Sequence, residues 1–186
     1  MTYLKVHRLK AQSVCLPNGM WGNVWGCSMR NNDLGVLNMS GLTDRLIELF
    51  VANGMELADG SLPSLYADSI YQNTLIVTRK IEDPEGYEEE MLNSRMNCAR
   101  QSIELLYGDT MEKFQLLSLK KKFRLYKTGK EMYAIVLTTF FFNNCHTCYQ
   151  GNKVQGMHCA EKPDIDAYVN INEELDMVEW DSDDEF

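Results

Sequence analysis

The alternation of apolar and polar residues predicts a β-hairpin near the start of the chain. Residues 4–15 and 20–29 both follow the period of strands, and the turn signal Pro17-Asn18-Gly19 lies between them. In the second strand we expect the odd-numbered Trp21, Trp25 and Cys27 on one face and Gly22 and Gly26 on the other.

Three later segments have the period of helices. Residues 42–52 carry apolar side chains at 3.6-residue spacing and end at Asn53-Gly54. Residues 83–108 are expected to start at an Asp-Pro pair and to stop at a glycine. Residues 130–149 are strongly apolar, so we expect this helix at the centre of the core.

Two acidic residues are the first candidates for chemistry. Asp68 lies in an apolar run, residues 65–71, which has the character of a buried strand, and Glu104 lies in the helical pattern of residues 83–108. A strand carboxylate and a helix carboxylate can bind one divalent metal, as phosphoryl-transfer nucleases require. The alternative is an N-cap aspartate and a solvated helix glutamate paired with Arg100, four residues before it.

Six stretches carry motifs of one family: in chain order they are residues 6–10, 17–19, 32–34, 38–42, 66–71 and 92–108, and the last two contain Asp68 and Glu104. Together they resemble the PIF/Harbinger-type transposases, a DDE family, and the resemblance runs from about residue 3 to about residue 150. It implies an α/β fold, an RNase H-like mixed sheet with flanking helices. It also implies metal-dependent cleavage and strand transfer of DNA, with Asp68 and Glu104 as catalytic residues that bind Mg²⁺ or Mn²⁺.

One departure from the family affects the expected activity. The family's first catalytic Asp lies on a strand upstream of the stretch that residues 6–10 resemble, and this sequence has no Asp or Glu before Asp33. The chain therefore resembles a domain whose first strand is missing. Two carboxylates leave coordination sites open, so we expect weak or no cleavage. Asp33 can in principle substitute, although a turn-capping role is the interpretation that we prefer. The alternative function is a non-catalytic DNA- or protein-binding module of the same origin.

The charge of the chain is concentrated at its end. Residues 161–186 hold eleven of the 27 acidic residues and one of the 18 basic ones, so the net charge of −9 does not describe the rest of the chain. We expect one domain, residues 1–155, followed by a disordered acidic tail, residues 156–186. Such a tail can bind a basic partner, cover the protein's own basic face, or serve only solubility.

A basic segment follows the predicted Glu104 helix and is a candidate DNA contact. Its seven cations surround Phe123 and Tyr126, so neutralisation of phosphates can be combined with stacking on bases. The alternative is a solvated loop between helices. The cations are Lys113, Lys120, Lys121, Lys122, Arg124, Lys127 and Lys130.

A second metal hypothesis concerns cysteines. Cys145, Cys148, His158 and Cys159 have the ligand types of a tetrahedral zinc site, although adjacent His and Cys chelate poorly. The alternative, which we favour, is that these thiols and Cys15, Cys27 and Cys98 pack as small apolar groups.

The remaining signals concern location and partners. No apolar run reaches the length of a membrane span and no signal peptide precedes the first strand, so we expect the nucleus or the cytoplasm. The family resemblance implies DNA as a partner, and a separate Myb-like DNA-binding protein or another transposase chain as a further one.

Overall fold

The protein is a mixed α/β chain that divides into two compact units. The computed structural model describes residues 9–28, 30–115 and 129–170. Unit 1 comprises Met1–Met29 and Ser102–Phe186, and unit 2 comprises Arg30–Gln101. The sequence had predicted one domain with a tail, and each unit is described by itself below.

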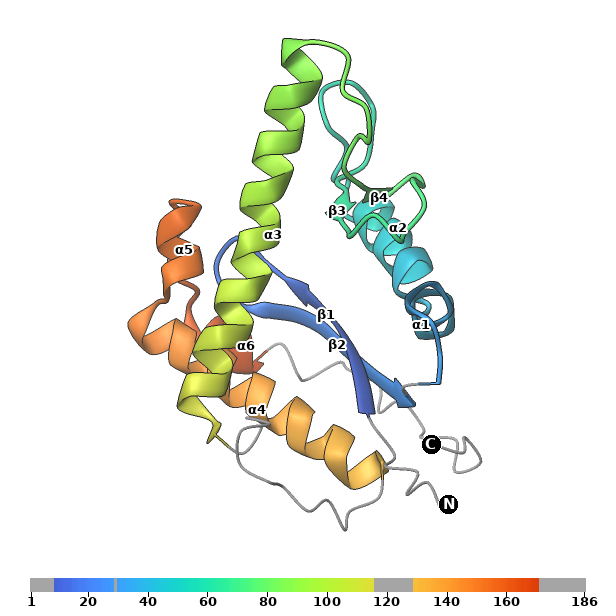
Figure 1. Ribbon diagram of the computed structural model, residues 1–186. Helices are drawn as coiled ribbons and strands as arrows, with labels where there is room; N and C mark the ends of the chain where they lie inside the picture. Colours follow the sequence, from blue (N-terminus) through green and yellow to red (C-terminus); the bar gives the residue numbers. More distant parts are fainter. Residues whose placement is uncertain (1–8, 29, 116–128, 171–186) are drawn as a thin grey trace. The chain divides into compact units, whose positions relative to one another are not determined.

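Unit 1 contains the predicted hairpin. Strands β1 (Leu9–Cys15) and β2 (Trp21–Ser28) pair antiparallel, as Figure 1 shows. The turn between them is closed by a bond from the Leu16 N–H to the Met20 carbonyl, and Gly19 has a φ of 80°. A left-handed residue is what glycine supplies in a tight turn. The hairpin prediction is therefore confirmed for residues 9–28.

The predicted faces of β2 were partly wrong because of a bulge. Val14 pairs with Asn23 while Cys15 pairs with Trp21, so Gly22 is the extra residue on β2. An extra residue reverses the alternation of side chains on one side of it. Trp21 therefore packs in the core on the same side of the hairpin as Val24. Strict alternation would have placed these two side chains on opposite faces.

Helices cover one face of this hairpin. They are the second half of α3 (Tyr87–Lys113), α4 (Gly129–Gln150), α5 (Lys153–Met157) and α6 (Ile165–Asn170) (Figure 1). The Trp21 and Phe140 rings stack with centroids 4.3 Å apart, and Tyr133 of α4 lies where a side chain on Gly26 would be. The buried cluster consists of Trp21, Leu106, Val136, Phe140 and Val154. The central role predicted for the helix of residues 130–149 is confirmed.

Unit 2 is built from shorter elements. Helices α1 (Asp33–Ser40) and α2 (Leu42–Ala52) are followed by the two-residue strands β3 (Leu65–Tyr66) and β4 (Val77–Thr78), which pair in parallel, and by the first half of α3. The bounds of α2 are those predicted. The cap of α1 is Asn32, whose Oδ1 accepts from the Gly35 N–H at 2.6 Å, and not Asp33.

Three expectations about the architecture need correction. The described strands form two separate two-stranded sheets, not one mixed sheet. Helix α3 passes through Gly108 because Leu106 and Thr110, on either side of the glycine, are both buried in unit 1. The disordered tail was predicted from residue 156, but α6 packs on α4, where the Tyr168 hydroxyl accepts from Asn144 at 3.1 Å. Residues 171–186 lie outside the described residues.

Candidate functional site

Asp68 lies in the loop directly after β3, within unit 2. It is exposed, its Oδ1 accepts from the Ser69 N–H at 2.8 Å, and its carbonyl accepts from the Tyr71 N–H at 3.0 Å. The buried strand of this pair is β4, with Val77 at 2% exposure. The prediction that Asp68 lies in a buried strand was therefore wrong, because the turn at residues 68–71 ends β3 after two residues. The position is nonetheless the carboxyl end of a parallel strand, where α/β proteins place ligands.

A second carboxylate acts on the surroundings of Asp68. Burial raises the pKa of the Tyr71 hydroxyl, and the charges of Asp33 and Asp68 raise it further. Two carboxylates that both affect one phenol lie within electrostatic range of it. Asp33, which we had expected to cap a turn, is therefore an acidic neighbour of the Asp68 loop in the same unit.

Glu104 lies on the solvent side of α3, in the half that belongs to unit 1. It is exposed, whereas Ser102 and Leu106, two residues to either side, are buried. Asp68 and Glu104 thus belong to different units. Among the residues that the structure describes, no three His, Cys, Asp or Glu side chains form a group able to hold a metal ion.

One polar residue on the buried side of α3 has a structural role. The Asn93 side chain is 5% exposed, donates to the Ile81 carbonyl at 3.0 Å and accepts from the Ile81 N–H at 2.9 Å. An amide side chain that pairs with both groups of a backbone residue takes the place of a neighbouring strand. Asn93 therefore fastens the segment after β4 to α3 and is not directed at a metal.

The basic segment lies mostly outside the described residues. Its first cation, Lys113, ends α3 and pairs with the Asp109 carboxylate at 2.6 Å. Its last, Lys130, lies in the first turn of α4 and is exposed. Lys120, Lys121, Lys122, Arg124 and Lys127 belong to the residues whose placement is not described. The DNA-contact hypothesis for this segment stays a prediction.

The four proposed zinc ligands have other surroundings. Cys148 is buried in α4, and burial raises its pKa, which disfavours the thiolate that zinc requires. His158 is the C-cap of α5, and its Nε2 lies 2.7 Å from the buried Ser102 hydroxyl. Cys159 is exposed, with a φ of 50°. The structure does not gather three of the four residues into a metal-binding group, and the packing interpretation accounts for Cys148.

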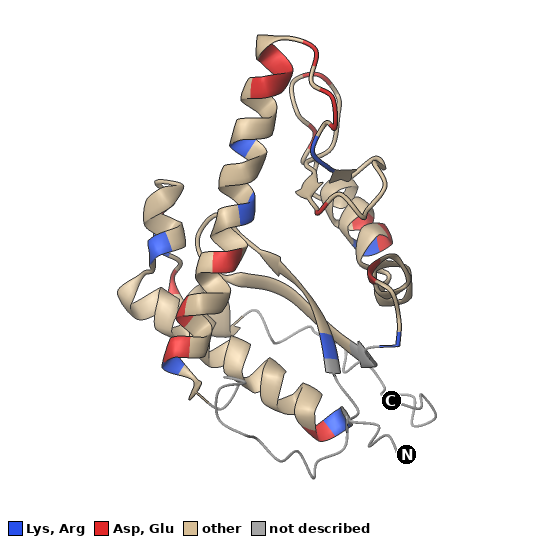
Figure 2. Ribbon diagram, in the orientation of Figure 1, with Lys and Arg blue, Asp and Glu red and all other residues tan. Residues whose placement is uncertain are grey.

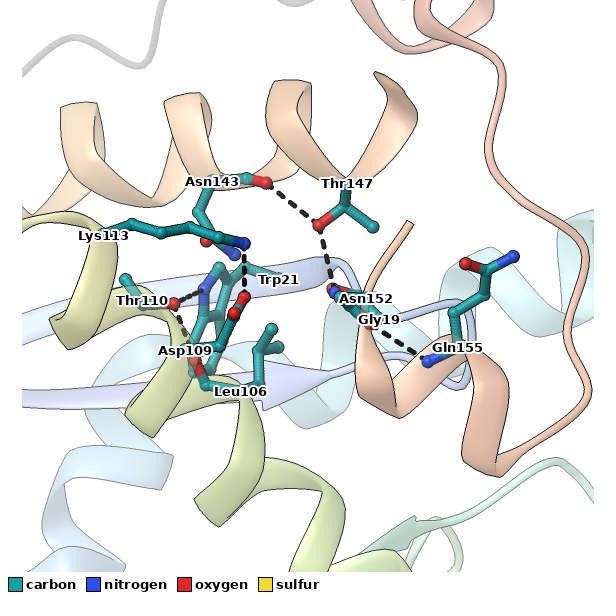
Figure 3. Close-up of polar contacts among 10 residues, drawn as sticks. All are labelled: Gly19, Trp21, Leu106, Asp109, Thr110, Lys113, Asn143, Thr147, Asn152 and Gln155. Atoms are coloured by element: carbon teal, nitrogen blue, oxygen red, sulfur yellow. Dashed lines mark hydrogen bonds and ion pairs between the residues drawn. The ribbon is translucent and has the colours of Figure 1, made fainter. Parts of the chain in front are cut away.

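A buried polar network in unit 1 was missed at the sequence level. The Trp21 indole donates to the Thr110 hydroxyl at 3.2 Å, and the Asn144 amide accepts from the Trp21 N–H at 2.8 Å and donates to the Trp21 carbonyl at 2.9 Å. Near the turn, Asn152 donates to the Gly19 carbonyl and to the Thr147 hydroxyl, as Figure 3 shows. Polar residues inside the apolar segment 130–149 were the available signal.

This network holds the hairpin against the helices and leaves one amide unsatisfied. Asn143 is 0% exposed, and neither polar atom of its side chain has a hydrogen-bond partner within the described part of the chain. On the strand side, the Tyr107 hydroxyl bonds with Ser13, and burial raises the pKa of Tyr107. The network therefore aligns backbone groups and exposes no reactive side chain.

The comparisons with known proteins identify no relative. No family model matches this chain, and no curated protein or solved structure matches it significantly. No helix in the described ranges is long and apolar enough to span a bilayer.

Proposed function

We propose that this chain is a transposase-derived DDE endonuclease domain that acts on DNA, with an RNase H-like fold and weak cleavage of its own. The observation that carries the proposal is the place of Asp68 at the carboxyl end of a parallel strand, with Asp33 acting on the same tyrosine. Glu104, on the helix that follows the second parallel strand, supplies the third carboxylate. The sequence motifs that surround Asp68 and Glu104 support the same family.

The donor set agrees with the chemistry that the family implies. Asp68 and Glu104 are exposed carboxylates, and hard oxygen donors suit Mg²⁺ and Mn²⁺. A cation bound by them would polarise a scissile phosphate and favour deprotonation of the attacking water. Asp33 is the residue of this chain that would complete the set. DNA is the expected partner, aided by a Myb-like protein or another transposase chain, and the nucleus is the expected compartment.

A nicking assay on supercoiled plasmid in Mn²⁺ tests the proposal. The full chain is compared with Asp68→Asn, Glu104→Gln and Asp33→Asn, each of which removes one carboxylate charge. Glu48→Gln on α2 is the matched control, because it removes the same charge from an exposed position outside the proposed set. Slow nicking that Asp68→Asn and Glu104→Gln abolish and Glu48→Gln preserves is the expected result. Nicking that survives both substitutions would exclude these carboxylates.

The second candidate is a non-catalytic DNA- or protein-binding module of the same origin. It is favoured by one finding, that no metal-binding group of three side chains occurs among the residues described. The same samples separate the two functions. DNA binding that weakens steeply with salt, without any nicking in Mn²⁺, would identify the module.

A further inference from the structure

Two thiols lie one helical turn apart on α4. Cys145 and Cys148 are both free; Cys145 is half-buried and Cys148 is buried. Residues three apart on an α-helix lie on the same side of it, and their Cα atoms are about 5 Å apart at the helical rise and radius. A disulfide spans about 4.4–6.8 Å between Cα atoms, so the backbone spacing of this pair can accommodate one.

Helix α6 packs over this pair of thiols. The Tyr168 ring stacks on Phe141 with centroids 5.9 Å apart, and the Tyr168 hydroxyl accepts from Asn144 at 3.1 Å. Burial raises the pKa of Tyr168, the bond from Asn144 lowers it, and the charges of the two thiolates raise it again. The positions that Tyr168 covers have the spacing of one helix face, and they are Phe141, Asn144, Cys145 and Cys148.

Among the described residues, the charged side chains that act on Cys148 come from the segment over α4. The helix itself has no Lys, Arg, Asp or Glu after Glu131, as Figure 2 shows. Burial is the largest cause of the raised pKa of Cys148; the charges of Cys145 and Asp164 raise it further, while a backbone hydrogen bond and Lys162 lower it. Cys148 therefore holds its proton, and the less buried Cys145 is the thiol that a reagent from solvent meets first.

A disulfide at this position would be strained and therefore readily reduced. Cβ atoms three residues apart on a helix are separated by about 5–6 Å, whereas a disulfide needs about 3.5–4.5 Å. Closing that gap requires distortion of the end of α4, which stops at Gln150. Strained disulfides are the labile and regulatory ones, and disulfides in reducing compartments are transient. The spacing suits a reversible link better than a permanent one.

We propose that Cys145 and Cys148 form a redox-sensitive dithiol, which a low-molecular-weight disulfide such as oxidised glutathione converts reversibly into a disulfide within α4. The Cys145 thiolate attacks one sulfur of the reagent, forms a mixed disulfide and releases one thiolate. The Cys148 thiol then loses its proton to solvent, and its sulfur attacks the Cys145 sulfur and releases the second thiolate. Two protein thiols are oxidised, and the reagent is reduced to two thiols.

This disulfide opposes the docking of α6. Distortion at the end of α4 shifts the helix face on which Tyr168 packs. The same face carries Asn144, which donates both to Tyr168 and to the Trp21 carbonyl. Oxidation therefore loosens α6, and reduction restores its packing. The inference does not depend on the nuclease proposal.

Titration of the full chain with reduced and oxidised glutathione tests the dithiol. Trypsin releases residues 131–153 as one peptide in which these are the only cysteines, so mass spectrometry detects the disulfide as the loss of two hydrogens. We expect a reversible disulfide within one chain and several-fold faster hydrogen exchange in residues 165–170. No reaction, a mixed disulfide as the only product, a disulfide between chains, or unchanged exchange in the oxidised chain would each overturn the proposal.

Three single substitutions separate the roles of the thiols. In Cys148→Ala the reaction should stop at the mixed disulfide on Cys145. In Cys145→Ala the buried Cys148 should react several-fold more slowly. Cys159→Ala is the matched control, because it removes an exposed thiol of unit 1 outside the pair and should leave the disulfide yield unchanged. Equal rates of adduct formation in Cys145→Ala and Cys148→Ala would overturn the proposal. Because no DNA is present, these results are independent of the nicking assay.

Discussion

The two units of this chain bury their apolar residues to different extents. In unit 1, helices α3, α4 and α5 and strand β2 contribute to one contiguous cluster, in which Leu106 is 0% exposed. Unit 2 also has fully buried residues, such as Ile76, but six of its large non-aromatic apolar side chains are more than half exposed, compared with none in the described part of unit 1. These are Met39, Leu49, Val51, Leu57, Ile70 and Leu75.

The difference follows from the length of the elements. A seven-residue strand paired with an eight-residue strand offers a face on which two long helices can pack. Two strands of two residues each offer no such face, so α2 keeps much of its apolar surface in water. The comparison indicates that unit 1 carries most of the stability of the chain and that unit 2 depends on fewer contacts.

The two units nevertheless share one kind of contact, an asparagine side chain that pairs with the backbone of an extended residue. Asn144 pairs with the backbone of Trp21 in unit 1, and Asn93 pairs with the backbone of Ile81 in unit 2, each through both groups of its amide. In both cases the amide of a helix residue bonds with the backbone N–H and C=O of an extended residue, where no neighbouring strand bonds with these two groups. This similarity allows the units to be compared by matched substitutions.

The largest expected effect is the loss of core packing in unit 1. Leu106→Ala should lower the free energy of unfolding by about 2–5 kcal/mol, because Leu106 lies at the centre of the cluster. Urea unfolding followed by tryptophan fluorescence measures it, because the three tryptophans lie at 21, 25 and 180 and none in residues 30–101. Leu105→Ala, at a position 41% exposed, is the control and should change the midpoint much less.

Substitution of Asn144 and of Asn93 tests whether the two units unfold separately. Asn144→Ala leaves the backbone groups of Trp21 unpaired and should cost about 1–3 kcal/mol, seen by tryptophan fluorescence. Asn93→Ala should cost a similar amount but change only the far-ultraviolet circular dichroism, because unit 2 has no tryptophan. Asn97→Ala, one turn further along α3 at an exposed position, is the control for Asn93.

If Asn93→Ala shifted the fluorescence midpoint as much as Asn144→Ala does, the two units would not unfold separately. Unit 1 has a control of its own in Asn143, whose buried amide has no partner within the described part of the chain. Asn143→Leu should change stability by less than about 1 kcal/mol, because no hydrogen bond is lost there.

A smaller effect is expected from the Cys15 thiol of unit 1 at alkaline pH. Burial raises the pKa of Cys15 from 9.0 to about 11. The folded state thus holds this proton more tightly than the unfolded state. The stability that comes from the protonated Cys15 thiol is fully present below pH 9 and is lost as the pH rises to 11. The loss in unfolding free energy is up to about 2 kcal/mol after allowance for partial exposure. The difference in unfolding free energy between the native chain and Cys15→Ala, measured from pH 8 to 11, should follow this course; a constant difference would contradict it.

The ion pairs give the smallest expected differences. In unit 2 the Arg79 and Glu82 charges lie 3.2 Å apart, with Glu82 68% exposed, so Glu82→Gln should cost no more than about 0.5 kcal/mol. In unit 1 Lys113 and Asp109 are 23% and 26% exposed, so Asp109→Asn should cost somewhat more, about 1 kcal/mol. Unfolding at low and high salt measures both. The effect of Glu82→Gln should vanish in 1 M salt, and a larger effect for Glu82 than for Asp109 would reverse the comparison.

Much of unit 1 could be predicted because its signals are local. The turn at residues 17–19 and the apolar period of residues 130–149 depend on neighbouring residues, and the structure confirms both. The bulge at Gly22 could not be predicted, because it depends on how Trp21 fits between α3 and α4. The buried pairing of Asn144 with Trp21 joins residues that are 123 positions apart, and no local pattern encodes it.

The candidate site shows the same limit. The sequence singled out Asp68 and Glu104 by their flanking motifs, and it considered Asp33 mainly as a cap. Only the fold showed that Asn32 is the cap and that the charge of Asp33 acts on Tyr71 together with Asp68. An electrostatic neighbourhood depends on distances across a loop, and spacing along the chain does not give those distances.

By itself, the sequence determined the elements with strong periodicity, the uneven distribution of charge and the acidic residues that merit testing. The tertiary structure decided which polar residues of those elements are buried, where the strands stop and how the chain divides into two units. The physical reason is that periodicity and turn chemistry act between near neighbours. Burial and pairing depend on what the rest of the chain brings to each face.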